Sequence, residues 1–113
     1  MAAAVCLGAF GAHGLRNRLD AYSLTVFEKA VFYHFVHALG VLIVPVMAKV
    51  QALAPEAAAR VCALLSAGIV LFSGSLYILA VTGVRALGMV TPFGGLSFVA
   101  AWILLAWALW RGV

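Results

Sequence analysis

Seven polar residues of the kinds that carry chemistry lie within otherwise apolar stretches of the chain: His13, His34, His37, Ser73, Ser75, Tyr77 and Thr91. Imidazole and hydroxyl groups can relay protons, bind small solutes or ligate metals. His34 and His37 are three positions apart, so a helix places them on one face. Polar groups inside an apolar helix normally face the interior of a bundle and need partners there. These seven residues form the candidate polar pocket.

Three hypotheses explain such a pocket. In the leading one, the side chains hydrogen-bond across helices and hold the bundle together. In the second, they line a pocket or partial pathway for a proton, an ion or a small solute. In the third, the imidazoles ligate a metal or haem. The third is the weakest, because there is no Cys ligand, fixed ligand spacing or inward carboxylate.

Catalysis has little support in the sequence. Ser73 or Ser75 with His37 could pair a nucleophile with a base. No Asp or Glu within the apolar segments would orient the imidazole, and no nucleophile elbow is present. The run GAFGAHG at residues 8–14 lacks the strand and the Lys-Ser/Thr pair of a phosphate-binding loop. We therefore expect no catalytic residue, no metal site and no cofactor, and a protein that is not an enzyme.

The composition determines the surroundings of these residues. Of 113 residues, 67% are hydrophobic and only 9% are charged. A soluble domain has roughly 45–50% apolar and about 25% charged residues. The charged residues fall between long apolar runs, and the net charge of +4 comes with no basic cluster. The chain therefore has the lipid bilayer as its partner and no nucleic acid.

Four apolar segments, residues 1–15, 26–50, 55–82 and 92–110, predict an all-α, integral membrane four-helix bundle in a single domain over residues 1–113. The last three are long enough to span a bilayer. A 15-residue helix reaches only about 22 Å of the roughly 30 Å hydrocarbon core. We therefore expect a first helix that is short, or clipped at its N-terminal end.

Several residues predict where the helices begin and how they bend. Thr25 and Glu28 form a capping box, which places the start of the second helix at about residue 26. Pro45 lies inside that helix, where it should kink the backbone and free the carbonyl of Val41. Small residues four positions apart predict close helix packing, at Ala4, Gly8 and Ala12, at Ala63 and Ala67, and at Ser97 and Ala101.

These helices place the polar residues at one depth. His34 and His37 lie within about 17 Å of the start of the second helix, and Ser73, Ser75 and Tyr77 lie roughly 9–15 Å from the end of the third. Both of these ends are on the side of the loops that carry Arg16 and Arg85. The polar side chains are therefore expected to gather in one half of the membrane.

Four stretches resemble the YgdD-like family of small bacterial membrane proteins, a domain of unknown function. They are GAFGAHGL at residues 8–15, residues 27–40, which contain YHFVHALG, FSGSLY at residues 72–77, and TPFGGL at residues 91–96 running on to Trp102. The resemblance implies a four-helix protein of the bacterial inner membrane. It implies no established activity, cofactor or catalytic residue. The family motif matches Tyr33 and His37 better than His34, which makes His37 the stronger candidate for a shared role.

The leading functional hypothesis is a non-enzymatic protein that acts through assembly, as a homo-oligomer or as an accessory subunit of a membrane complex. Small size, small-residue faces and the lack of a catalytic set favour it. The alternative is the handling of a small solute, proton or ion through the polar pocket, and a haem or metal site comes third.

Overall fold

The computed structural model describes all 113 residues, which form helices without any strand, so the all-α prediction is confirmed. Two short π-helical segments and one 3-10 segment interrupt or join the α-helices. In chain order the elements are α1 (Ala2–Phe10), η1 (Gly11–Leu15), α2 (Ala21–Lys49), α3 (Pro55–Gly68), η2 (Ile69–Gly74), α4 (Ser75–Thr82), η3 (Arg85–Met89) and α5 (Thr91–Arg111).

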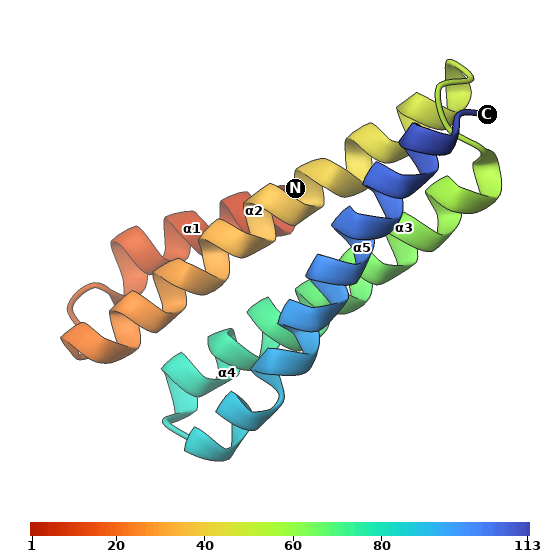
Figure 1. Cartoon of the computed structure of the whole chain (residues 1–113). Helices are drawn as coiled ribbons and strands as arrows, with labels where there is room; N and C mark the ends of the chain where they lie inside the picture. The colour runs from red at the N-terminus through yellow and green to blue at the C-terminus, as the bar shows by residue number, and fades with distance from the viewer.

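These elements make four helical rods in an elongated molecule of 50 × 26 × 15 Å. α2 and the continuous rod α3–η2–α4 run antiparallel, and α5 packs along α3 and η2 (Figure 1). The short α1 lies beside the first half of α2, and the N-terminus is next to the middle of α2 (Figure 1). The C-terminus lies beside the connection between α2 and α3.

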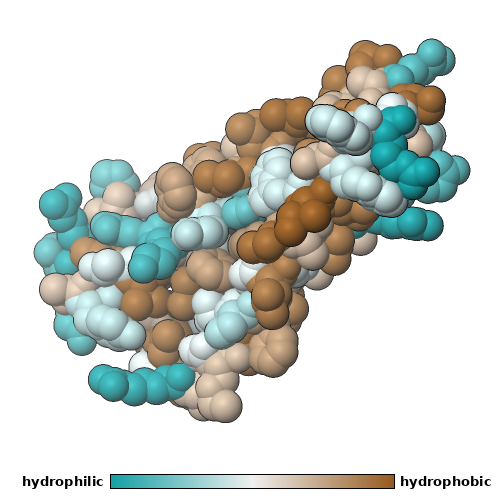
Figure 2. Space-filling model, viewed as in Figure 1, coloured by the Kyte–Doolittle hydropathy of each residue, from teal (hydrophilic) through white to brown (hydrophobic).

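Three of the rods are long and apolar enough to cross a membrane: Ala21–Lys49, Pro55–Thr82 and Arg85–Arg111. The first apolar helix, Ala2–Leu15, is shorter, as its length predicted. Hydrophilic side chains gather at the two ends of the face shown in Figure 2, and hydrophobic ones dominate between them. Only 23 of the 113 residues are buried, so most apolar side chains face outward, as expected where the surroundings are lipid.

The main core lies where α2, α3 and α5 meet. Its larger buried side chains are those of Val44, Leu53, Val61, Leu65, Phe98 and Leu105, and Ala101 is fully buried among them. At the other end of the molecule, Leu15, Phe27 and Ala80 form a smaller cluster that joins η1, α2 and α4. Together the two clusters fix the rods against one another at both depths.

The capping box predicted at Thr25 is wrong, because α2 begins at Ala21, five residues before the predicted start at about residue 26. The carboxylate of Asp20 accepts a hydrogen bond of 2.7 Å from the Ser23 N–H and so caps the helix. The Thr25 hydroxyl donates instead to the Ala21 carbonyl at 2.8 Å, within the first turn. The hydrogen bond to the Ser23 N–H holds the pKa of Asp20 below its ordinary value.

The third rod is not the uninterrupted α-helix that residues 55–82 predicted, because the π-helical η2 divides it into α3 and α4. α2, in contrast, continues through Pro45. The Val41 carbonyl, which loses its hydrogen bond to the proline, lies 4.0 Å from the Cys62 thiol of α3. The thiol is a weak donor at that carbonyl.

Small residues do bring helices together, but not at every predicted position. On α5, Ala101 is fully buried and the Ser97 hydroxyl donates to the Leu64 carbonyl at 2.6 Å. On α3, Ala63 and Ala67 are exposed and do not belong to the core of this chain. Gly68 takes that role, because the Phe98 ring lies directly over its Cα, where a Cβ would overlap the ring.

Candidate functional site

His37 is the most deeply placed histidine, with 5% of its surface exposed. Its Nδ1 lies 2.7 Å from the Tyr33 carbonyl, and because a carbonyl only accepts, Nδ1 carries the hydrogen. The imidazole stacks on the Phe98 ring at a centroid distance of 3.5 Å and an angle of 11°. Trp102 lies beside it, with its ring centroid 5.9 Å away. His37 therefore holds α2 against α5.

An aromatic cluster that the sequence analysis missed surrounds this histidine. The Tyr33 ring lies 4.4 Å from Phe72 of η2, and Phe72 lies 5.7 Å from Phe98 of α5, between ring centroids. The four-residue spacing of Tyr33 and His37 was the available signal, because it puts both rings on one face of a helix. Only the packing of η2 and α5 shows what those rings contact.

The two serines of the third rod bind two different helices. Ser73 is fully buried, and its hydroxyl donates to the Ala30 carbonyl of α2 at 2.8 Å. The Ser75 hydroxyl lies 2.7 Å from the Thr91 hydroxyl at the start of α5 and 2.9 Å from the Phe72 carbonyl. Ser73 in η2 and Ser75 at the start of α4 therefore give the rod polar contacts with neighbours on both sides.

His34 has a different environment from His37. Its Nδ1 lies 3.0 Å from the Tyr77 hydroxyl of α4, and both side chains are only partly buried. The Tyr77 ring also packs on Phe27 at a centroid distance of 5.1 Å. This pair joins α2 to α4.

The seven predicted residues therefore do not share one pocket. The structure brings together His34 with Tyr77 and Ser75 with Thr91, whereas Ser73 and His37 each bind a backbone carbonyl. His13 lies in η1 and is exposed, away from the other six. No group of three or more His, Cys, Asp or Glu side chains is close enough together to hold a metal ion.

Three of the seven residues line an open apolar groove between α1 and the third rod. The groove has a volume of about 460 Å³, and its polar residues are His34, Ser75 and Tyr77. A second groove of about 300 Å³ shares His34, Ile69 and Val70 with it, so the depression continues along the same side of α2 and α3. This is the largest concave surface that includes predicted residues.

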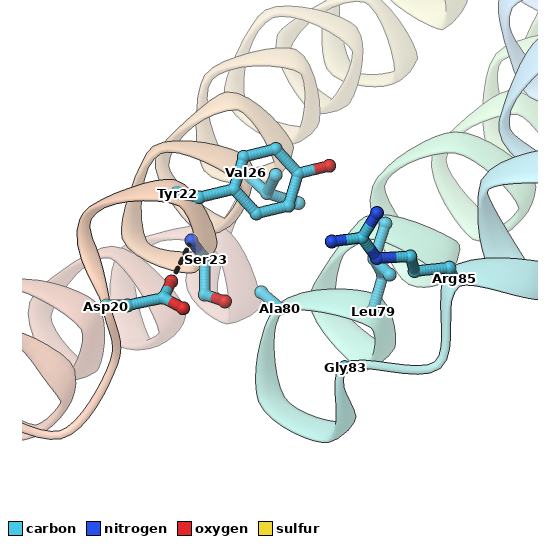
Figure 3. A pocket seen from close by; sticks show the side chains of 8 residues that line it. All are labelled: Asp20, Tyr22, Ser23, Val26, Leu79, Ala80, Gly83 and Arg85. Carbon is cyan, nitrogen blue, oxygen red and sulfur yellow. Dashed lines mark hydrogen bonds between the residues drawn. The ribbon is translucent and has the colours of Figure 1, made fainter.

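A smaller pocket of about 140 Å³ lies among the loops, where α2 begins and α4 ends. Figure 3 shows Asp20 hydrogen-bonded to the Ser23 N–H on one wall, and Arg85 reaching from the other wall toward Tyr22. The sequence analysis did not single out these residues. The pocket holds one acidic and one basic side chain, and the acidic one already caps α2.

Comparison with known proteins identifies relatives of most of this chain. The profile of a family described as "Protein of unknown function (DUF423)" matches residues 7–95. The chain is 48% identical over 98 residues to UPF0382 membrane protein SH2409 of Staphylococcus haemolyticus, which covers 87% of this chain and 78% of that protein. It is also 48% identical over 103 residues to UPF0382 membrane protein YwdK of Bacillus subtilis, covering 90% of this chain and 82% of that protein.

No solved structure matches the chain. The relatives carry the name of membrane proteins, in agreement with the three apolar rods that are long enough to span a bilayer. The motifs predicted a family of small bacterial membrane proteins without an assigned activity, and in that form the prediction is confirmed. The chain belongs to the DUF423 family of membrane proteins.

Proposed function

We propose that this protein acts through assembly in the bacterial inner membrane, without catalysing a reaction, as a four-span subunit that binds a second copy of itself or another membrane protein. The YgdD-like resemblance of its motifs agrees with that location. The observation that carries the proposal is a face of α3 that the fold leaves uncovered. Ala59, Ala63 and Ala67 lie on it at intervals of four residues, and all three are exposed.

The position of this face on α3 supports an external partner. α3 meets α2 and α5 through Ala58, Val61, Leu65 and Gly68, which are all buried. The alanine face lies on the opposite side of the same helix. Since lipid chains are as apolar as leucine, helices associate in a membrane where small residues let their backbones approach closely. A row of three alanines offers a second helix that close approach.

The hydrogen bonds inside the chain also favour assembly over a transport pathway. Ser73, Ser75 and Thr91 each bond to a backbone or side-chain group of this chain. His37 is sealed in an aromatic stack, and no fully buried polar side-chain atom lacks a partner. A pathway for a proton or an ion needs polar groups that are free to bind it. These groups instead act as packing contacts.

The mass of the purified protein in a mild detergent, measured by light scattering, tests the proposal. We expect a particle with at least two chains, or one chain with a co-purifying membrane protein. Ala63→Leu and Ala67→Leu should reduce it to a monomer, because their longer side chains hold the backbones apart. Both residues are exposed, so the variants should still fold as helical monomers.

Ala106→Leu is the matched control, because Ala106 is an exposed alanine on α5, away from the alanine face. It should leave the particle mass unaltered. A wild-type protein that is monomeric and co-purifies with nothing would refute the proposal. So would an oligomer whose mass is the same in all three variants, since its interface would then lie elsewhere.

A further inference from the structure

The His34–Tyr77 pair holds one hydrogen that the protein does not use. A neutral imidazole carries one N–H and a tyrosine carries one O–H. In the 3.0 Å contact between His34 Nδ1 and the Tyr77 oxygen, only one of these hydrogens is donated. If Tyr77 donates, the imidazole hydrogen is on Nε2 and is free. If Nδ1–H donates, the tyrosine hydrogen is free.

The free hydrogen is accessible from the apolar groove. His34 and Tyr77 both line it, and no fully buried polar side-chain atom lacks a partner, so the spare donor is not enclosed within the protein. In the hydrocarbon region there is little water to accept it, and an unsatisfied donor there is costly. An acceptor oxygen on a molecule in the groove would satisfy it.

The groove itself suits an uncharged molecule with an apolar tail. None of the ten lining residues is Asp, Glu, Lys or Arg, and six of them are aliphatic. The neighbouring groove of about 300 Å³ extends the apolar surface past Ile69 and Val70, which gives room for a tail. The π-helical η2 forms this wall, and π-helical turns occur frequently at functional sites.

Depth distinguishes between classes of lipid. His34 lies five residues beyond the exposed Lys29 on α2, or about 8 Å further into the membrane. Tyr77 lies five residues before the end of α4, again about 8 Å inside. A phospholipid is held at the interface by its charged phosphate, because charge is expelled from hydrocarbon. A neutral head group can reach the pair, and a phospholipid head group cannot.

We propose that the groove between α1 and the η2–α4 rod binds a neutral, lipid-soluble carbonyl compound of the prenylated quinone class, whose carbonyl oxygen accepts the free hydrogen of the His34–Tyr77 pair. The tail lies along Ile69 and Val70. The polar contact at His34 and Tyr77 does not involve Ala59, Ala63 or Ala67 of the alanine face, so different variants test the binding and the assembly.

Native mass spectrometry of the purified protein in detergent micelles tests the proposal, with decylubiquinone as the probe. We expect one adduct per chain that saturates with probe concentration. Decylbenzene, which has the same tail and no carbonyl, should give less than a tenth of that adduct. A zwitterionic phospholipid offered in excess should not displace the probe.

Variants of the pair test the role of the free hydrogen. Tyr77→Phe and His34→Phe keep a ring in place and each leave one hydrogen for the ligand. Each also removes the partner that fixes the direction of that hydrogen, so each should weaken binding about 2- to 10-fold. The double variant removes both and should abolish the adduct. Tyr33→Phe is the matched control, because this tyrosine precedes His34 but packs on Phe72 outside the groove, and binding should be unchanged.

A variant that fills the groove tests whether the probe binds there, while His34 and Tyr77 stay unchanged. A Cβ built at Gly74 has only the Ile69 carbonyl oxygen near it, at 3.9 Å, so Gly74→Leu fits the fold and occupies the groove. It should abolish the adduct while the thermal midpoint stays near that of the wild type. Equal adducts in the wild type, Gly74→Leu and the double variant would overturn the proposal, as would no adduct in the wild type or a phospholipid that displaces the probe.

Discussion

Replacing Gly94 with alanine should destabilise the protein, because α5 crosses η2 at this residue with no space for a side chain. A Cβ at Gly94 would overlap the backbone nitrogen of Phe72 and lie 2.7 Å from its Cβ and 2.8 Å from its Cα. Ordinary contacts to a Cβ begin at about 3.4 Å. Backbone atoms cannot rotate away as a side chain can, so the two helices must separate by roughly 0.7–1 Å.

The magnitude follows from two opposing effects. Overpacking of this kind costs about 1–3 kcal/mol, and the involvement of backbone places Gly94 toward the upper end. Alanine also favours the helix over glycine by roughly 0.5–1 kcal/mol. We therefore expect Gly94→Ala to lower the free energy of unfolding by about 1–2 kcal/mol.

Gly95 is the matched control on the same helix. The nearest atom to a Cβ at Gly95 is Phe72 Cδ2 at 3.9 Å, which is an ordinary contact. Gly95→Ala should therefore keep only the helical gain and be as stable as the wild type, or more stable by about 0.5–1 kcal/mol. Unfolding by SDS in mixed micelles, followed by tryptophan fluorescence, measures both. Equal stabilities for Gly94→Ala and Gly95→Ala would refute the packing of α5 on η2.

Three further predictions concern stability and use the same unfolding assay. His37→Ala should lower the free energy of unfolding by about 2–4 kcal/mol, because it leaves a cavity in the aromatic stack. His37→Phe should lower it less, because the new ring fills the space and only the hydrogen bond to the Tyr33 carbonyl is lost. Equal losses for the two variants would contradict the stack. Ser73→Ala should lower stability by about 1 kcal/mol and the exposed Ser66→Ala should not, since only the Ser73 hydroxyl reaches α2. Asp20 has a depressed pKa in the folded protein, so its stabilisation is complete above its ordinary pKa of 3.8 and is lost as the pH falls through the lower folded value. Asp20→Asn keeps an acceptor for the cap and should remove that acid-dependent loss; an unchanged pH profile would show that other groups cause it.

Hydropathy and length were sufficient to predict the helical rods and the short first helix, because long apolar runs in a membrane must be helical to satisfy their backbone. The sequence did not determine the first residue of α2. Asp20 and Thr25 are both good N-cap residues, and the sequence alone does not say which one the chain uses. The structure decides for Asp20, because Leu19 and Val26 pack on the Leu15–Phe27 cluster and keep the first turns helical.

The polar residues were predicted to gather in one pocket, but the structure directs them to different neighbours. Depth follows from counting residues along a helix, whereas direction depends on which neighbour each side chain meets. His34 and His37 differ by about 60° around the helix axis, and that is enough to send one toward Tyr77 and the other toward Phe98. Sequence patterns could not predict the π-helical turn in η2 either. The contacts around it, of Ser73 with Ala30 and of Ser75 with Thr91, come from the tertiary fold.

Disulfide cross-linking in native membranes tests most directly whether the alanine face of α3 is an interface. In a background with Cys6→Ala and Cys62→Ala, Ala63→Cys should give an oxidised product at twice the chain mass, or joined to another membrane protein. Close helix contacts meet the roughly 4.4–6.8 Å Cα separation of a disulfide. Ala106→Cys on α5 should give none. Absence of the Ala63→Cys product, or equal products from both variants, would contradict assembly through this face.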